Sequence, residues 1–217
     1  MRVSIVAAMT LCGRIGPGFK GSPVDRAFLE EMREKTKASL IGAGTFRYQG
    51  CEMKGARGRV PEDRIRAIIT ASGEIPLESR HIFIDGPRPL IFTLKDRVPR
   101  LLQLLKGRAE VIGCNSNRGQ GGVSLDEVFH YLDDMGANDI LVEGGAVLNY
   151  NVMKSGLCTD LYVTISPKVL GLRGAPSLMD GPEPLGDPTL DLELVDLRHS
   201  TQSGEVFLHY RVLKGAR

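Results

Sequence analysis

Apolar residues in this chain form short runs, and segments with a helical spacing of apolar residues lie between these runs. A run such as residues 140–142 is too short for a buried helix and suits a strand that is buried on both faces. Residues 22–33 and 124–135 carry apolar side chains three or four positions apart, which is typical of amphipathic helices. This alternation of strands and helices predicts an α/β protein.

Helix boundaries are marked by ordinary capping signals. Ser22 precedes Pro23 as a predicted N-cap, and Ser124 and Glu127 match a capping box. The predicted helices are residues 23–33, 99–106, 125–135 and 146–154. The predicted strands are residues 3–8, 38–41, 66–70, 81–84, 90–93, 109–114, 140–142, 159–165, 192–198 and 206–213. We expect a three-layer fold whose mixed, mostly parallel sheet ends in antiparallel C-terminal strands.

The stretch of residues 138–148 joins a buried strand, a Gly144-Gly145 turn and a helix. The first N–H groups of a helix lack partners within the helix, and together with the helix dipole they favour an anion such as a phosphate. Glu143 stands beside this turn, at the end of the strand. The alternative is an ordinary strand-to-helix connection, because glycine is common in turns.

Two further strand ends carry similar chemistry, at residues 42–45 and 70–72. Carboxyl ends of parallel strands line one edge of an open sheet, where α/β proteins bind their ligands. Three such ends together favour a dinucleotide. The usual dinucleotide fingerprint of three spaced glycines after the first strand is absent, so another nucleotide-binding fold is expected.

Composition narrows the class of protein. The 217-residue chain is 42% hydrophobic and 25% charged, with a formal net charge of +2, and it has no long basic run. These values do not favour a nucleic-acid or membrane partner, and they fit a cytoplasmic protein. The basic residues between positions 54 and 66 are interpreted as a solvated loop. The four cysteines and four histidines are widely spaced, so no metal site is predicted.

Five segments taken together resemble the riboflavin-biosynthesis pyrimidine reductases, in order and in spacing. The segments are Ala8-Met9-Thr10-Leu11-Cys12-Gly13-Arg14-Ile15, Ser22-Pro23-Val24-Asp25-Arg26, Gly42-Ala43-Gly44-Thr45, Val142-Glu143-Gly144-Gly145 and Pro167-Lys168-Val169-Leu170-Gly171. The resemblance implies a single reductase domain over residues 1–217 with a dihydrofolate-reductase-like fold, NADPH as cofactor and a homodimer. It also implies hydride transfer to the ribose C1′ of a ribosylamino-pyrimidine 5′-phosphate through its open-chain imine.

The resemblance assigns roles to residues of this chain. Glu143 matches a catalytic carboxylate at the substrate end, and Arg33 and Gln49 match substrate-binding positions; a surface arginine is the alternative for Arg33. The residues matched to the cofactor site are Ala8, Ile15, Phe19, Gly44, Thr45, Thr70, Ser72, Gly144, Gly145, Ala146 and Val147. Thr70 and Ser72 are expected near a 2′-phosphate.

Two positions depart from the pattern of the family. Cys12 stands in the first loop where the family has aspartate, and Gln49 replaces a carboxylate linked to substrate binding. An amide keeps hydrogen-bonding capacity without the charge. Two alternatives therefore stay open. The protein is a reductase of another pterin, pyrimidine or carbonyl substrate, or it is a non-catalytic nucleotide-binding relative. The sequence has no His-x-Glu and no Pro-Cys-x-x-Cys motif, so a zinc deaminase active site is not expected in it.

Overall fold

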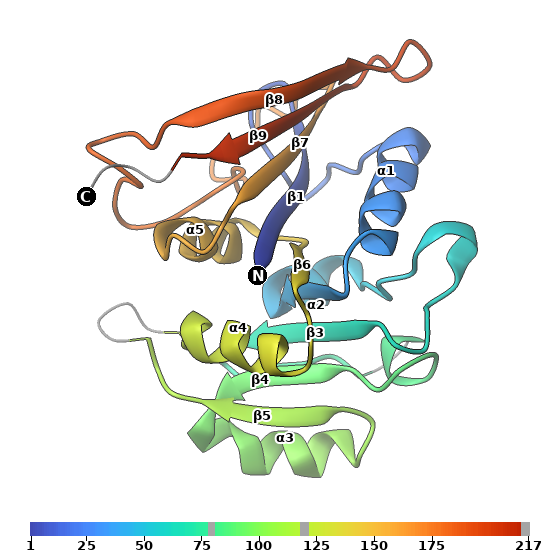
Figure 1. The fold of residues 1–217 in the computed structure, drawn as a ribbon, viewed down its shortest axis with the longest axis vertical. Helices are drawn as coiled ribbons and strands as arrows, with labels where there is room; N and C mark the ends of the chain where they lie inside the picture. The colour runs from blue at the N-terminus through green and yellow to red at the C-terminus, as the bar shows by residue number, and fades with distance from the viewer. Residues whose placement is uncertain (78–80, 118–121, 214–217) are drawn as a thin grey trace. The chain divides into compact units, whose positions relative to one another are not determined.

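The computed structural model describes residues 1–77, 81–117 and 122–213. Its strands form a nine-stranded sheet in the order β5-β4-β3-β2-β6-β1-β7-β9-β8. Strand β1 pairs with β7 in parallel, and β2, β3, β4 and β5 pair in parallel with one another in turn. The pairs β7–β9 and β8–β9 are antiparallel. The predicted fold class, a mixed and mostly parallel sheet with antiparallel C-terminal strands, is confirmed (Figure 1).

The elements follow one another in an alternating order, as the sequence predicts. In chain order they are β1 (Arg2–Thr10), α1 (Pro23–Glu34), β2 (Ala38–Gly42), α2 (Ala43–Gln49), η1 (Ala56–Gly58), β3 (Ile65–Thr70), η2 (His81–Phe83), β4 (Leu90–Leu94), η3 (Lys95–Arg97), α3 (Val98–Leu105), β5 (Glu110–Cys114), α4 (Leu125–Asp134), β6 (Asp139–Val142), α5 (Ala146–Lys154), β7 (Asp160–Ser166), β8 (Leu192–His199) and β9 (Val206–Val212).

Contacts divide the chain into two compact units, and the expectation of a single domain stays a prediction. The first unit comprises Arg33–Ile140 with Met1, and the second comprises Arg2–Met32 and Leu141–Arg217.

Helices cover both faces of the strands in the first unit. One face of the sheet, including Ile68 and Ile91, packs with Phe46 of α2 and Leu101 of α3 in a single apolar cluster. Side chains alternate between the faces of a strand, so Phe92 points to the other face. There it meets Tyr131 of α4 edge to face, with ring centroids 5.5 Å apart. The three-layer arrangement is therefore present within this unit.

In the second unit, α1 covers one face of β1, β7 and β9. Phe28 of α1 contacts Tyr162 of β7 and Phe207 of β9, with ring centroids 6.2 Å and 5.2 Å apart. Ser22 caps α1 as predicted, because its Oγ accepts hydrogen bonds from the N–H groups of Val24 and Asp25 at 3.0 Å and 3.2 Å.

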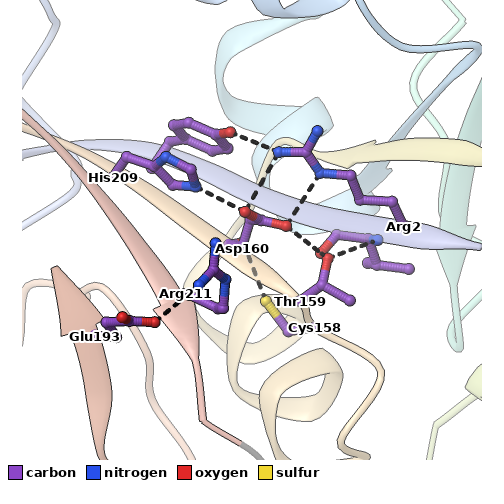
Figure 2. A network of polar contacts seen from close by, with 9 residues as sticks. Arg2, Cys158, Thr159, Asp160, Glu193, His209 and Arg211 are labelled. Atoms are coloured by element: carbon purple, nitrogen blue, oxygen red, sulfur yellow. Dashed lines mark hydrogen bonds and ion pairs between the residues drawn. The ribbon is translucent and has the colours of Figure 1, made fainter. Parts of the chain in front are cut away.

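A polar network joins the starts of β1 and β7 within the second unit (Figure 2). Asp160 is only 9% exposed. Its carboxylate accepts hydrogen bonds from Arg2 Nε at 3.1 Å and Thr159 Oγ1 at 2.8 Å, and it lies 2.7 Å from His209 Nε2. Tyr162 stacks on the His209 ring at 4.2 Å. Burial raises the pKa of the Asp160 carboxyl, but the hydrogen bonds outweigh burial and hold this pKa below its usual value.

Several predicted details are wrong. Residues 81–84 do not form a strand, since His81–Phe83 is a 3₁₀-helix. The helical spacing of residues 22–33 predicts that Ala27 faces inward, but Ala27 is exposed. Glu127 does not complete the capping box: Ser124 Oγ accepts from the Glu127 N–H, but the Glu127 carboxylate accepts from Asn115 N at 2.9 Å and from its side-chain amide.

The interpretation of residues 54–66 as a solvated loop is also wrong for its last arginines. Arg64 and Arg66 are 5% and 1% exposed. Arg64 donates to the carbonyls of Arg33 and Thr36, and Arg66 donates to those of Ile82 and Pro87. Burial lowers the pKa of Arg66 to about 10, which still leaves it charged at neutral pH. Both arginines thus fasten loops inside the first unit.

Candidate active site

The turn between β6 and α5 has the form predicted for an anion site. Ile140, Leu141 and Val142 are 1%, 0% and 0% exposed, as expected for a strand buried on both faces. Gly144 adopts a φ of +86°, which side chains rarely tolerate, and this explains the glycine. The N-cap of α5 is Gly145, which has no side chain to bond the first N–H groups of the helix. These N–H groups remain available to a phosphate.

The residues around this turn differ in exposure. Glu143 is half-buried directly after β6, and Val147 in the first turn of α5 is 63% exposed. Asn149 is fully buried and donates through Nδ2 to the Leu178 carbonyl at 3.0 Å. This bond attaches α5 to the loop that follows β7, so the helix N-terminus is held in place within the second unit.

The turn after β2 leads into the short helix α2, which has no side-chain cap. Gly42 is the N-cap of α2. The sequence allows two roles for Thr45, capping a short helix or binding an anion; the capping role is wrong, and the anion-binding role stays a prediction. Gly44 is exposed, and a Cβ added there would meet no atom within 4 Å. The surface over Gly44 is therefore open to a ligand. Gln49 is the last residue of α2.

The turn after β3 is shaped by the two predicted hydroxyl residues. Thr70 Oγ1 accepts from Gly73 N at 3.1 Å, and Ser72 Oγ accepts from Glu74 N at 3.3 Å. Ser72 is exposed. Because its oxygen accepts from the backbone, its hydroxyl hydrogen can still be donated to a ligand.

Two arginines that the sequence did not single out flank this turn. Arg47 of α2 donates to the Glu74 carbonyl at 3.0 Å. The side chain of Arg97 lies against Gly73, where an added Cβ would be 3.3 Å from Arg97 Cβ. Both arginines are exposed. Nothing in the local sequence points to them, because the contacts join the end of β3 to α2 and to η3.

The loop after β1 is fastened to the loop after β7. Leu11 N donates to the Lys168 carbonyl at 2.8 Å, and Ile15 N donates to the Pro176 carbonyl at 3.0 Å. Phe19 is 6% exposed and the Lys168 ammonium lies 5.9 Å from the centre of its ring. Ala8, near the end of β1, is half-buried beside its register partner Thr164. The loop is thus anchored at several points rather than loosely connected.

Cys12 makes one of these connections. The N–H of Leu170 points to its Sγ at 3.4 Å, and the Thr10 hydroxyl lies 3.2 Å from the same atom. Hydrogen bonds from the Gly171 backbone, the Thr10 side chain and the Leu170 backbone lower the pKa of Cys12 to about 7. The groups around Cys12 thus favour its thiolate form.

Arg33 is buried in the first unit. It is 1% exposed, donates through Nη1 to the Lys54 carbonyl at 2.8 Å and points Nη2 to Cys51 Sγ at 3.2 Å. The alternative of a surface helix arginine is therefore excluded. Its substrate role stays a prediction.

The structure gathers the predicted site residues within each unit. Gly44, Thr45, Thr70, Ser72 and Arg33 belong to the first unit, and Ala8, Ile15, Phe19 and residues 143–147 belong to the second. That these two sets serve one ligand stays a prediction. The described residues include no group of three His, Cys, Asp or Glu side chains that could hold a metal ion, and no helix among them could span a membrane.

A mostly parallel sheet with glycine turns at its strand ends defines an α/β protein, a class that takes its ligands at the carboxyl ends of its strands. Residues 3–207 match the RibD C-terminal domain, and the chain belongs to this family.

Known relatives agree with this assignment. The chain is 28% identical over 219 residues to the 2,5-diamino-6-ribosylamino-4(3H)-pyrimidinone 5′-phosphate reductase of Methanothermobacter thermautotrophicus, with 98% of each chain covered. It is 27% identical to the riboflavin biosynthesis protein RibD of Chlamydia trachomatis, covering 80% of this chain and 44% of that protein.

Solved structures show the same fold. A pyrimidine reductase-like protein from Corynebacterium diphtheriae superposes with a TM-score of 0.78 at 20% identity, covering 98% of this chain and 92% of the other. Dihydrofolate reductase from Enterococcus faecalis superposes with a TM-score of 0.56 at 17% identity, covering 98% and 97%. The predicted dihydrofolate-reductase-like fold is confirmed.

Proposed function

We propose that this protein is an NADPH-dependent reductase of riboflavin biosynthesis that converts the ribosylamino group of a pyrimidine 5′-phosphate into a ribitylamino group. The observation that carries the proposal is the uncapped N-terminus of α5 after the Gly144-Gly145 turn, in a chain of the RibD C-terminal domain family. NADPH, when bound, supplies the hydride that reduces C1′ of the open-chain imine.

Cofactor binding is assigned to the turns after β2, β3 and β6 and to β1 with the loop that follows it. The N–H groups at Gly44, Thr45 and residues 144–147 suit the pyrophosphate, because uncompensated donors favour anions. Ala8, Ile15 and Phe19 line the nicotinamide end. Ser72 can donate to a 2′-phosphate, and the positive charges of Arg47 and Arg97 beside its turn favour that phosphate.

Substrate binding is assigned to Glu143, Arg33 and Gln49. A carboxylate at Glu143 suits ribose hydroxyls or pyrimidine amino groups, since it can only accept hydrogen bonds. It would orient C1′ towards the nicotinamide. The Gln49 amide can accept hydrogen bonds, as a carboxylate does, and it can also donate them. Pyrimidines with different ring substituents should therefore be tested as substrates.

The test is a titration with NADPH followed by turnover. Binding is measured by cofactor fluorescence, and oxidation at 340 nm is followed after adding the diamino-pyrimidinone or the amino-uracil ribosyl 5′-phosphate. Oxidation with either compound and a ribityl product support the proposal. Tight binding without oxidation of NADPH, with these and with other pterin or carbonyl compounds, would instead identify a non-catalytic nucleotide-binding protein.

We further propose a homodimer formed through the β8–β9 hairpin. All of β8 is exposed, and Leu192, Leu194 and Leu197 are 37%, 51% and 56% exposed. The register places these leucines beside Val212, Tyr210 and Leu208 of β9, which are half-buried. One face of the hairpin thus carries a continuous row of apolar side chains, and exposed apolar surfaces mark interaction sites. A second copy of the chain would cover it with a two-fold symmetric contact.

A further inference from the structure

A second carboxyl group of the second unit lies in a polar environment that the assignments above do not use. Asp25 sits in the first turn of α1 and is half-buried. A Cβ added to Gly21 would be 1.9 Å from Asp25 Oδ2, so the carboxyl group occupies the space that this glycine leaves. Position 25 is thus held against the chain that leads into α1.

Buried hydroxyl groups of β7 belong to the same environment. Thr164 and Ser166 are each 1% exposed. Neither hydroxyl has a hydrogen-bond partner among the described residues, and the Thr164 hydroxyl is near enough to the Asp25 carboxyl to lower the pKa of that carboxyl. Buried hydroxyl groups are rarely left unpaired in a folded protein, so a polar ligand is expected to complete their bonding.

A second carboxylate acts on Asp25 from the start of β9. Glu205 is 1% exposed, and it accepts from Ser22 Oγ at 2.5 Å and from Ser203 Oγ at 2.9 Å. Burial raises the pKa of the Asp25 carboxyl, the Thr164 hydroxyl opposes this effect, and the negative charge of Glu205 adds to it. Arg26, the neighbouring charged group of α1, lowers this pKa, although it also pairs with Glu30 at 2.7 Å.

The register of β1 with β7 places Thr164 and Ser166 next to residues of the proposed nicotinamide end. Thr164 pairs with Ala8, and Ser166 pairs with Thr10 at the carboxyl ends of these parallel strands. Ligands of open α/β sheets bind at that edge. The Asp25 carboxyl is therefore next to the hydroxyl group that neighbours Ala8 in the sheet.

We propose that Asp25 is the proton donor of the reduction, acting beside Thr164 on the substrate nitrogen attached to C1′. This inference rests on the proposed function. When C1′ accepts the hydride, the π electrons of the C1′=N bond pass to the nitrogen, which then needs one proton. The Asp25 carboxyl gives this proton and becomes a carboxylate, and because the residue is only half-buried, water returns the proton. NADPH is oxidised and C1′ is reduced.

Asp25→Asn tests the role directly. We expect kcat/KM to fall by about 10² or more, the usual contribution of a general acid, with the Kd for NADPH unchanged. A donor must be protonated, so wild-type kcat/KM is high below the pKa of Asp25 and falls as pH rises through it. Asp25→Asn should lose this decline. The control is Asp126→Asn, which removes an exposed first-turn carboxylate from α4 and should leave kcat/KM within about twofold.

Variants of two neighbours of Asp25 should shift the pH at which kcat/KM declines, in opposite directions. They keep the inference testable if Asp25→Asn fails to fold. Glu205→Gln removes a negative charge, so the decline should move to lower pH. Thr164→Val removes the hydroxyl that favours the Asp25 carboxylate, so the decline of kcat/KM should move to higher pH. Carbon-13 NMR titration of the Asp25 carboxyl in the cofactor-free protein should give a pKa above 3.8 that falls in Glu205→Gln.

The outcomes separate the two proposals. If the wild-type protein turns over but Asp25→Asn keeps both its rate and its pH profile, Asp25 is not the donor and the reductase function stands. If the wild-type protein does not oxidise NADPH with any of the tested substrates, the proposed function fails, and the role of Asp25 fails with it. A parallel fall of kcat/KM and Tm in Asp25→Asn, with the pH profile unchanged, would show a capping role only.

Discussion

From the proposed preference for NADPH it follows that removing Arg97 should make the affinities for NADPH and NADH more nearly equal. Arg97 lies against Gly73, one residue from Ser72, and its side chain is 45% exposed. Its Nε lies 3.4 Å from Oδ2 of Asp96, and this ion pair leaves the terminal nitrogens of the guanidinium for a phosphate.

The size of the effect follows from this exposure. A hydrogen bond to a charged group contributes about 1.5–3 kcal/mol, and solvent screening at a half-exposed side chain favours the lower end of that range. A loss of about 1.5 kcal/mol corresponds to a roughly tenfold weaker Kd. We therefore expect Arg97→Ala to weaken NADPH binding about tenfold and to leave the Kd for NADH within about twofold.

The matched control is Arg88→Ala. Arg88 precedes β4 whereas Arg97 follows it, so the two arginines stand at opposite ends of one strand, and they are 59% and 45% exposed. Both variants remove one positive charge, and both Kd values can be measured by fluorescence titration at fixed ionic strength. Equal weakening of NADPH and NADH in Arg97→Ala, or an equal loss of NADPH affinity in Arg88→Ala, would refute a specific contact with the 2′-phosphate.

Three further outcomes are expected. Glu143→Gln should lower kcat/KM strongly with the Kd for NADPH nearly unchanged; a joint fall of NADPH affinity and Tm would instead show that Glu143 only shapes the turn. Leu194→Lys with Leu197→Lys should give a monomer in light scattering at micromolar concentration, whereas a persistent dimer would exclude this face. Asp160→Asn should lower Tm at neutral pH. Because the folded pKa of Asp160 is depressed, the difference from wild type should be complete above the unfolded pKa, near 3.9, and should vanish as pH falls through the folded pKa; a constant difference down to pH 2 would contradict it.

Local signals predicted the elements around the glycine turns well. The boundaries of α5 and the burial of β6 agree with the sequence, because Gly144 and Gly145 stop the strand and the apolar run has no polar face. Ser22 and Pro23 likewise set the start of α1 through bonds within a few residues. Such features depend on short-range chemistry that the sequence displays directly.

Features that depend on tertiary contacts were not predictable in this way. The apolar residues 81–84 resemble a strand, but His81–Phe83 forms a 3₁₀-helix that buries Ile82 and Phe83 in the first unit. Arg66 looks like a solvated charge until the Ile82 and Pro87 carbonyls that surround it are known. The position of Arg97 beside Gly73 depends on the pairing of β3 with β4, which no local pattern encodes.

The two carboxyl groups next to β7 show how surroundings separate a stabilising acid from a reactive one. Asp160, at the amino end of the strand, is surrounded by Arg2, Thr159 and His209, and these partners favour the carboxylate. Asp25, beside Thr164 further along the strand, faces burial and a second carboxylate, and these favour the protonated acid. Partners that favour the carboxylate hold the pKa of Asp160 low, whereas burial and a neighbouring carboxylate raise the pKa of Asp25, so Asp25 keeps its proton to higher pH than Asp160 does. The proton donor is therefore expected at the carboxyl end of β7, where a parallel sheet presents its ligands, and the ion-pair network at the amino end is assigned to stability.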